Sequence, residues 1–145
     1  MSDLANVYSS KGKLQEAEAL QQKTLEIQRR VLGPEHTHTL ITMNNLALSY
    51  LEQKRFDEAE KMLRETLVLD TRVRGKDHPF TLDTEFNIAV VLAQSGRRAE
   101  GLRMLRDIVQ RGFAGEWLED SMLEPLRNDT EFMSLVAEVK KRKQG

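Results

Sequence analysis

Two histidines, His36 and His38, have the spacing of a metal-binding pair. They lie in the stretch GPEHTHTL, which begins at Gly33, and the chain of 145 residues contains only one other histidine. In a loop or strand, an H-x-H pair can place both imidazoles on one metal ion. The stretch recurs 42 residues later as GKDHPFTL, where His78 replaces His36 but Phe80 replaces His38. Because a metal pair needs both ligands, we expect no metal site, and we predict that His36 and His78 cap helices.

The same two stretches contain the residues that end one helix and begin another. Gly33 and Gly75 are placed to end a helix in the left-handed conformation that glycine adopts most easily. Pro79 suits the first position of the following helix, which leaves His78 as its N-cap. The two stretches therefore predict joints between helices.

Residue patterns typical of enzymes are missing from the sequence. It has no cysteine, no glycine-rich phosphate loop, and neither a GxSxG nor an HExxH motif. Its carboxylates recur with the 42-residue period, which predicts solvated helix surface near turns, not an acid/base pair. These are Glu16, Glu18, Glu58, Glu60 and Glu100. We therefore expect no catalysis and no cofactor.

Charge and hydropathy restrict the partners. The net charge is -1 and the pI is near 6.3, so no overall positive field would attract nucleic acid or an anionic membrane. The first residues lack the layout of a signal peptide, and no apolar run reaches the roughly 18 residues of a membrane-spanning helix. We expect a cytoplasmic protein. The basic run from Lys140 to Lys143 could bind a polyanion, but a solvated helix end is the commoner explanation.

An internal repeat of 42 residues organises the chain. Residues 4–45 and 46–87 are identical at 16 of 42 aligned positions, far more than unrelated sequences would share. A third, weaker copy begins at Ile88, and its register is lost after Val109. The chain is therefore predicted to be built from repeated structural units.

Each repeat has the pattern of two antiparallel helices joined by a tight turn. Apolar residues recur at helical spacing in both halves of the second copy. We place the turns at Gly12, at Lys54 and Arg55, and at Gly96. Neither helix could bury its apolar stripe alone, so the hairpins must stack, which predicts an all-α fold, an α-solenoid. Small residues are expected where the helices approach most closely: Ala5, Ala47 and Ala89 in the first helices, and Ala17, Ala59 and Gly101 in the second.

The order Leu46-Ala47-x-x-Tyr50 followed by Ala59-x-x-x-Leu63 resembles the tetratricopeptide repeat. The 42-residue period, the EAE triplets and the Gly-x-x-His-Pro linker resemble the kinesin-light-chain type of that repeat. The resemblance covers about residues 2–111. It implies about three hairpins in residues 1–111, the first of them truncated at its N-terminus. Thr71 replaces the proline that ends the second helix in the family, so we expect this helix to run about one turn further.

Residues 112–145 depart from the repeat and are predicted to form capping helices. Their Trp-Leu-x-x-Asp pattern from Trp117 resembles the tail that follows such repeats in bacterial multidomain proteins, some of them serine/threonine kinases. Asn128 or Asp129 can cap a last helix. We expect Trp117 and Phe132 to anchor this cap, and we expect the chain to belong to a longer protein.

The resemblance implies a function in protein-protein interaction. In this family the first helix of each hairpin lines a concave groove that binds extended peptides, and asparagines at the positions of Asn45 and Asn87 bind the ligand backbone. The alternatives are that these asparagines only join neighbouring helices, or that the chain is a regulatory domain that docks in cis on an attached enzyme such as a kinase. The predicted groove residues are Asn6, Ile41, Asn44, Asn45, Leu48, Asp83, Phe86, Asn87 and Val90.

Overall fold

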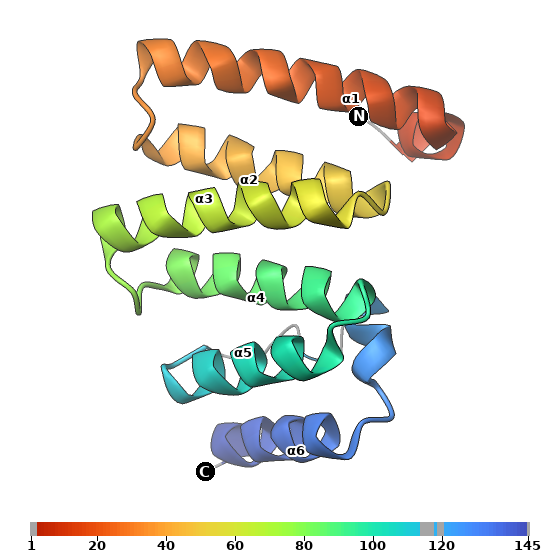
Figure 1. The fold of residues 1–145 in the computed structure, drawn as a ribbon, viewed down its shortest axis with the longest axis vertical. Coiled ribbons are helices and arrows are strands. Elements are labelled where there is room, and N and C mark those ends of the chain that lie inside the picture. The colour runs from red at the N-terminus through yellow and green to blue at the C-terminus, as the bar shows by residue number, and fades with distance from the viewer. Residues whose placement is uncertain (1–2, 114–117, 119–120, 145) are drawn as a thin grey trace. The chain divides into compact units, whose positions relative to one another are not determined.

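The computed structural model describes residues 3–113, 118 and 121–144, with the backbone alone for residues 3–11, 121, 143 and 144. In these residues every regular element is a helix (Figure 1), which confirms the all-α prediction. The elements are α1 (Asp3–Val31), α2 (Thr37–Glu52), α3 (Phe56–Arg74), α4 (Pro79–Gln94), α5 (Arg98–Gln110), the 3-10 helix η1 (Ser121–Leu126) and α6 (Thr130–Gln144). None of the described helices is both long and apolar enough to cross a membrane.

The chain divides into two compact units, Met1–Leu69 and Asp70–Gly145, and the division lies inside α3. In the first unit, the predicted hairpin of α2 and α3 is confirmed. The turn is made by Lys54, which has a positive φ of 61°. Ala47 of α2 and Ala59 of α3 are both fully buried, as expected where two helices approach closely. α3 continues to Arg74, which confirms the extension predicted from Thr71.

The turn predicted at Gly12 is wrong, because α1 is one helix of 29 residues that continues through this glycine. Gly12 does not have the positive φ of Gly33, Gly75, Gly96 and Gly112. A glycine inside a helix costs only about 1 kcal/mol relative to alanine. The local sequence therefore does not force a turn, and packing between two helices would have to stabilise one. Ala17 of α1 is exposed, in contrast to the buried Ala59 at the same position of the second repeat.

In the second unit, α4 and α5 form the third predicted hairpin, with Gly96 in the left-handed conformation at the turn (φ 94°). Gly101 is buried at the crossing, where an added Cβ would lie 3.0 Å from the carbonyl oxygen of Ala89. Even an alanine would crowd the backbone of α4 there. The prediction of close approach at Ala89 and Gly101 is therefore confirmed.

η1 and α6, which follow α5 in the chain, pack within the second unit. Asp129 is the N-cap of α6, since its Oδ1 accepts hydrogen bonds from the backbone N–H groups of Glu131 (2.9 Å) and Phe132 (3.1 Å). η1 lies beside α4 (Figure 1). The Gln94 Nε2 donates a hydrogen bond to the Met122 carbonyl oxygen at 2.9 Å. Phe132 is buried, whereas Trp117 lies outside the described residues.

Candidate functional site

Both predicted histidine caps are present. The Nδ1 of His36 accepts a hydrogen bond from the backbone N–H of His38 at 3.1 Å, and the Nδ1 of His78 accepts one from Phe80 at 3.1 Å. Each histidine is the N-cap of its helix, α2 and α4 respectively. The ring of His36 stacks on His38, and the ring of His78 contacts Phe80. His36 therefore caps α2 through its Nδ1, while its ring lies against the ring of His38.

A second interaction repeats at each joint. The Thr39 hydroxyl donates to the Gly33 carbonyl oxygen at 2.8 Å, and the Thr81 hydroxyl donates to the Gly75 carbonyl oxygen at 2.8 Å. Both threonines are fully buried, so these bonds are shielded from water. The two joints therefore set the starts of α2 and α4 by the same bonds. In the part of the chain that the structure describes, no group of three or more histidine, cysteine or acidic side chains is placed to hold a metal ion.

The predicted groove residues of α2 lie on one face of this helix, at spacings of three, four and seven residues. Ile41 is 44% exposed, Asn45 is exposed, and Asn44 and Leu48 are half-buried. Asn44 already interacts with another group of the chain. α2 therefore presents the Asn45 amide between two accessible apolar side chains, Ile41 and Leu48. Asn6 lies in α1, but its side chain is outside the described residues.

The corresponding face of α4 is different, because the chain itself covers its apolar residues. Phe86 is 6% exposed and Val90 is fully buried. The ring of Phe113, which follows α5, stacks on Phe86 with the ring centroids 5.2 Å apart. Asp83 is exposed and Asn87 is half-buried, and both already have partners within the chain. Phe86 and Val90 thus contribute to the core of the second unit in this structure.

An arginine network at the α2–α3 turn holds the first unit together. The Arg55 guanidinium pairs with Glu58 at 2.6 Å and also with Glu18 of α1, and it lies 4.6 Å from the centre of the Tyr50 ring. Hydrogen bonding to Glu58 raises the pKa of Arg55, and Arg55 lowers the pKa of Glu58. The Glu18 side chain is 12% exposed and also accepts a hydrogen bond from Gln53. The prediction of a solvated glutamate is therefore wrong for Glu18.

The pair made by Arg55 recurs with the repeat, a signal that could have been found in the sequence. Lys13–Glu16 and Arg97–Glu100 occupy the same positions as Arg55–Glu58, and all three pairs are formed. The two residues of each pair are three positions apart. The pairs of Arg55 and Arg97 lie at the start of the second helix of a hairpin, and the pair of Lys13 lies at the corresponding position of α1. Their regular place indicates surface stabilisation near the turn, and not acid/base chemistry.

Arg111, at the end of α5, has a similar role in the second unit. Its guanidinium binds Glu85 of α4 through two hydrogen bonds of 2.7 and 3.0 Å, and it pairs with Asp77 at 3.0 Å. The hydrogen bonds to Glu85, first among several causes, raise the pKa of Arg111. This arginine fastens α5 to α4 and to the joint that precedes α4. The repeat pattern carries no signal for Arg111, because this arginine has no equivalent in the other repeats.

The helix hairpins, the repeated joints and the accessible face of α2 define a helical repeat protein of the α-solenoid class. The family model of the tetratricopeptide repeat matches residues 1–69 and 42–111, which is most of the chain. The chain therefore belongs to the tetratricopeptide repeat family, whose members are generally non-catalytic protein-interaction modules.

Solved structures support the same fold. Two crystal structures of nearly identical TPR-like repeats from a kinesin light chain-like protein of Podosopora anserina, one of them a variant, are similar to this chain. Their TM-scores are 0.68 and 0.67 at 21% sequence identity, and the matches cover 97% of this chain and 73% and 74% of those chains. These matches agree with the predicted kinesin-light-chain resemblance at the level of the fold, whereas the resemblance of the C-terminal tail stays a prediction. No curated protein matches the chain significantly.

Proposed function

We propose that the chain is a non-catalytic module that binds an extended peptide of a partner protein along the inner face of its first helices, with α2 as the principal contact. The observation that carries this proposal is the stripe on α2, where exposed Asn45 lies between Ile41 and Leu48. An asparagine amide both donates and accepts, so it can pair with a peptide N–H and C=O whatever the peptide sequence.

The surroundings of the stripe favour binding without rearrangement. The opposite face of α2 is anchored by Leu40, Met43 and Leu46, each 1% exposed or less, and its first turn is fixed by the cap and the threonine bond of the joint. A rigid helix loses little entropy on binding, which leaves more of the contact energy for affinity. Ile41 and Leu48 would supply apolar contacts on each side of the amide.

A peptide array tests this proposal with the wild type and three variants, Asn45→Ala, Asn45→Ala/Asn87→Ala and Ile41→Asp. We expect Asn45→Ala to weaken binding of the selected peptides about tenfold, because an unpaired peptide group would be left in the interface. Ile41→Asp should abolish binding of the same peptides. Lys61→Ala is the matched control, since Lys61 is exposed on α3 and lies outside the stripe. Peptides that bind Asn45→Ala, Asn45→Ala/Asn87→Ala and Ile41→Asp as tightly as the wild type would contradict the assignment to α2.

A second candidate function, docking in cis within a longer protein, is favoured by one observation. Residues that follow the repeats already occupy the face of α4, through the Phe86–Phe113 stack and the bond from Gln94 to the Met122 carbonyl. The face of a first helix in this fold can therefore accept a segment of its own chain. An array in which the wild type selects no peptide would contradict the peptide proposal and favour this one.

A further inference from the structure

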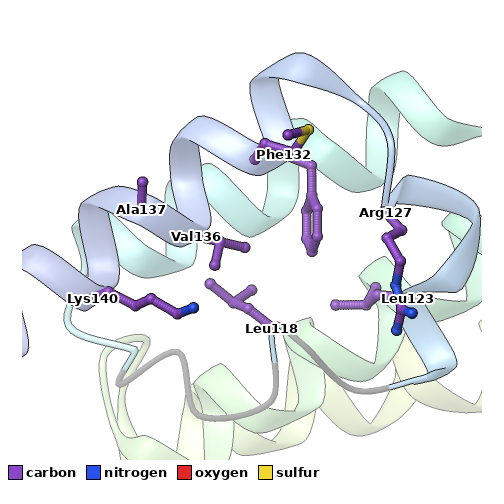
Figure 2. Close-up of a pocket in the computed structure, with 8 residues that line it drawn as sticks. Leu118, Leu123, Arg127, Phe132, Val136, Ala137 and Lys140 are labelled. Carbon is purple, nitrogen blue, oxygen red and sulfur yellow. The ribbon is translucent and has the colours of Figure 1, made fainter.

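A cleft in the second unit is lined by residues of α6 and η1 together with Leu118 and Arg127, and it is not part of the groove proposed above. It encloses about 570 Å³, which is within the range of ligand sites. Leu118, Leu123 and Phe132 form its floor and are 5% exposed or less. Val136 of α6 points toward Leu118 (Figure 2). The exposed residues Met133 and Ala137 of the same helix also line the cleft.

Two cations are placed at the ends of this apolar lining. Arg127 lies beside Leu123 at one end and Lys140 lies at the other end, along α6 (Figure 2). Among the described residues, the lining contains these two basic side chains and no acidic one. Both are exposed. Arg127 pairs with Glu124 at 3.2 Å, and Lys140 also has a partner within the chain. The Arg127–Glu124 pair is exposed and therefore weak, so a ligand carboxylate can compete with Glu124 for Arg127.

The length of the cleft suggests how much of a ligand it holds. Met133 and Lys140 are seven residues apart on α6, which corresponds to about 10 Å along a helix. An extended peptide covers the same length with about three residues. The cleft thus matches a short extended segment whose central side chains are apolar and whose ends are acidic.

We propose that this cleft binds an acidic peptide of a partner protein, with one or two bulky apolar side chains on the Leu118–Leu123–Phe132 floor and carboxylates at Arg127 and Lys140. The site shares no residue with the stripe on α2, so it goes beyond the function proposed above. Charge complementarity selects the partner and sets its orientation. The apolar floor supplies the affinity.

The experiment is fluorescence anisotropy with the 145-residue chain and a small set of fluorescein-labelled peptides. Each probe has a central pair, Phe-Leu, Leu-Leu or Met-Phe, with Asp and Glu on both sides. Two control peptides replace the acidic residues by Gln and Asn, or the apolar pair by Ser. We expect at least one acidic probe to bind, with an affinity that falls as the salt concentration rises. Both control peptides should bind at least about tenfold more weakly.

Variants of the cleft supply the specificity test. Lys140→Glu, Arg127→Glu and Met133→Glu should each weaken binding by about tenfold or more, because each places a like charge beside the ligand carboxylates. All three positions are exposed, so the fold should tolerate the change, which circular dichroism would verify. Lys141→Glu is the matched control, since Lys141 is exposed on the same helix but does not line the cleft. Asn45→Ala should also leave binding unchanged, which separates this site from the groove on α2.

Several results would overturn the proposal. These are no binding of any acidic probe at about 1 mM, equal effects of Lys140→Glu and Lys141→Glu, and equal binding of the neutral control peptide. Binding of dodecanoate without binding of any acidic probe would assign the cleft to a small amphiphile instead and would also overturn it.

Discussion

At the scale of single residues, the two joint histidines show how a residue suited to metal binding can serve in structure. His36 and His78 each use a lone pair on Nδ1 to accept a backbone N–H near the start of a helix. Serine, threonine, asparagine or aspartate usually makes this bond. The function of the histidines could be predicted because the repeat supplied two copies, and only one residue of the H-x-H pair recurs.

His78→Ala should lower the free energy of unfolding by about 1 kcal/mol, because the first turn of α4 loses its side-chain cap. His78→Asn should retain most of the stability, since the asparagine oxygen can accept the same N–H group. Urea denaturation followed by circular dichroism would measure both. If both variants lost the same stability, the cap would not be the relevant interaction.

Asp70 is a buried carboxyl in the second unit, only 1% exposed. It accepts hydrogen bonds from the Thr84 hydroxyl at 2.7 Å and from Arg74 at 2.9 Å. Burial raises the pKa of Asp70 in spite of these two partners. The folded chain therefore binds a proton at Asp70 more readily than the unfolded chain does.

The sign of the pH dependence follows from this shift. The contribution of Asp70 to stability is fully present below the ordinary aspartate pKa of 3.8, and it is lost as the pH rises through the raised pKa of the folded state. We expect the unfolding free energy of the wild type, minus that of Asp70→Asn, to fall over this range and then to level off. Urea denaturation of both proteins at a series of pH values measures this difference in unfolding free energy. A difference that increases with pH would show that Arg74 dominates over burial.

At the scale of elements, a helix hairpin could be predicted where both helices bury an apolar stripe. This holds for α2 with α3 and for α4 with α5, where Lys54 and Gly96 make the turns with positive φ. The prediction of a hairpin fails at Gly12, where the aligned repeats suggested a turn but α1 continues as one helix. A turn depends on the packing of the two helices that it joins, and sequence alignment does not report that packing.

Matched glycine substitutions test the difference between these positions. Gly12→Ala should stabilise α1 by about 0.5–1 kcal/mol, because alanine favours a helix and nothing lies within 4 Å of the added Cβ. Gly96→Ala should destabilise the chain by about 1 kcal/mol or more, since φ is 94° there. Thermal denaturation by circular dichroism distinguishes the two. Destabilisation by Gly12→Ala would indicate a turn at residue 12.

At the scale of the whole molecule, the repeat predicted the family and the residues of the inner faces, but not which of them stay accessible. Positions in α2 and α4 that are equivalent in sequence differ in burial: Leu48 is half-buried and Val90 is fully buried. Phe86 of the same α4 face is covered by Phe113, a residue after α5 that lies outside the repeat register. Repeat alignment therefore identifies a face, whereas non-repeated residues such as Phe113 affect which part of it stays accessible.

Binding of a partner peptide by α2 can be observed residue by residue. It is tested most directly by a two-dimensional amide NMR titration of the chain with a peptide selected on the array. We predict that the largest chemical-shift changes fall on residues 41–48, including the side-chain amide of Asn45, and that they disappear in Asn45→Ala/Ile41→Asp. Shift changes that spare α2, or that persist in this double variant, would show that the peptide binds elsewhere.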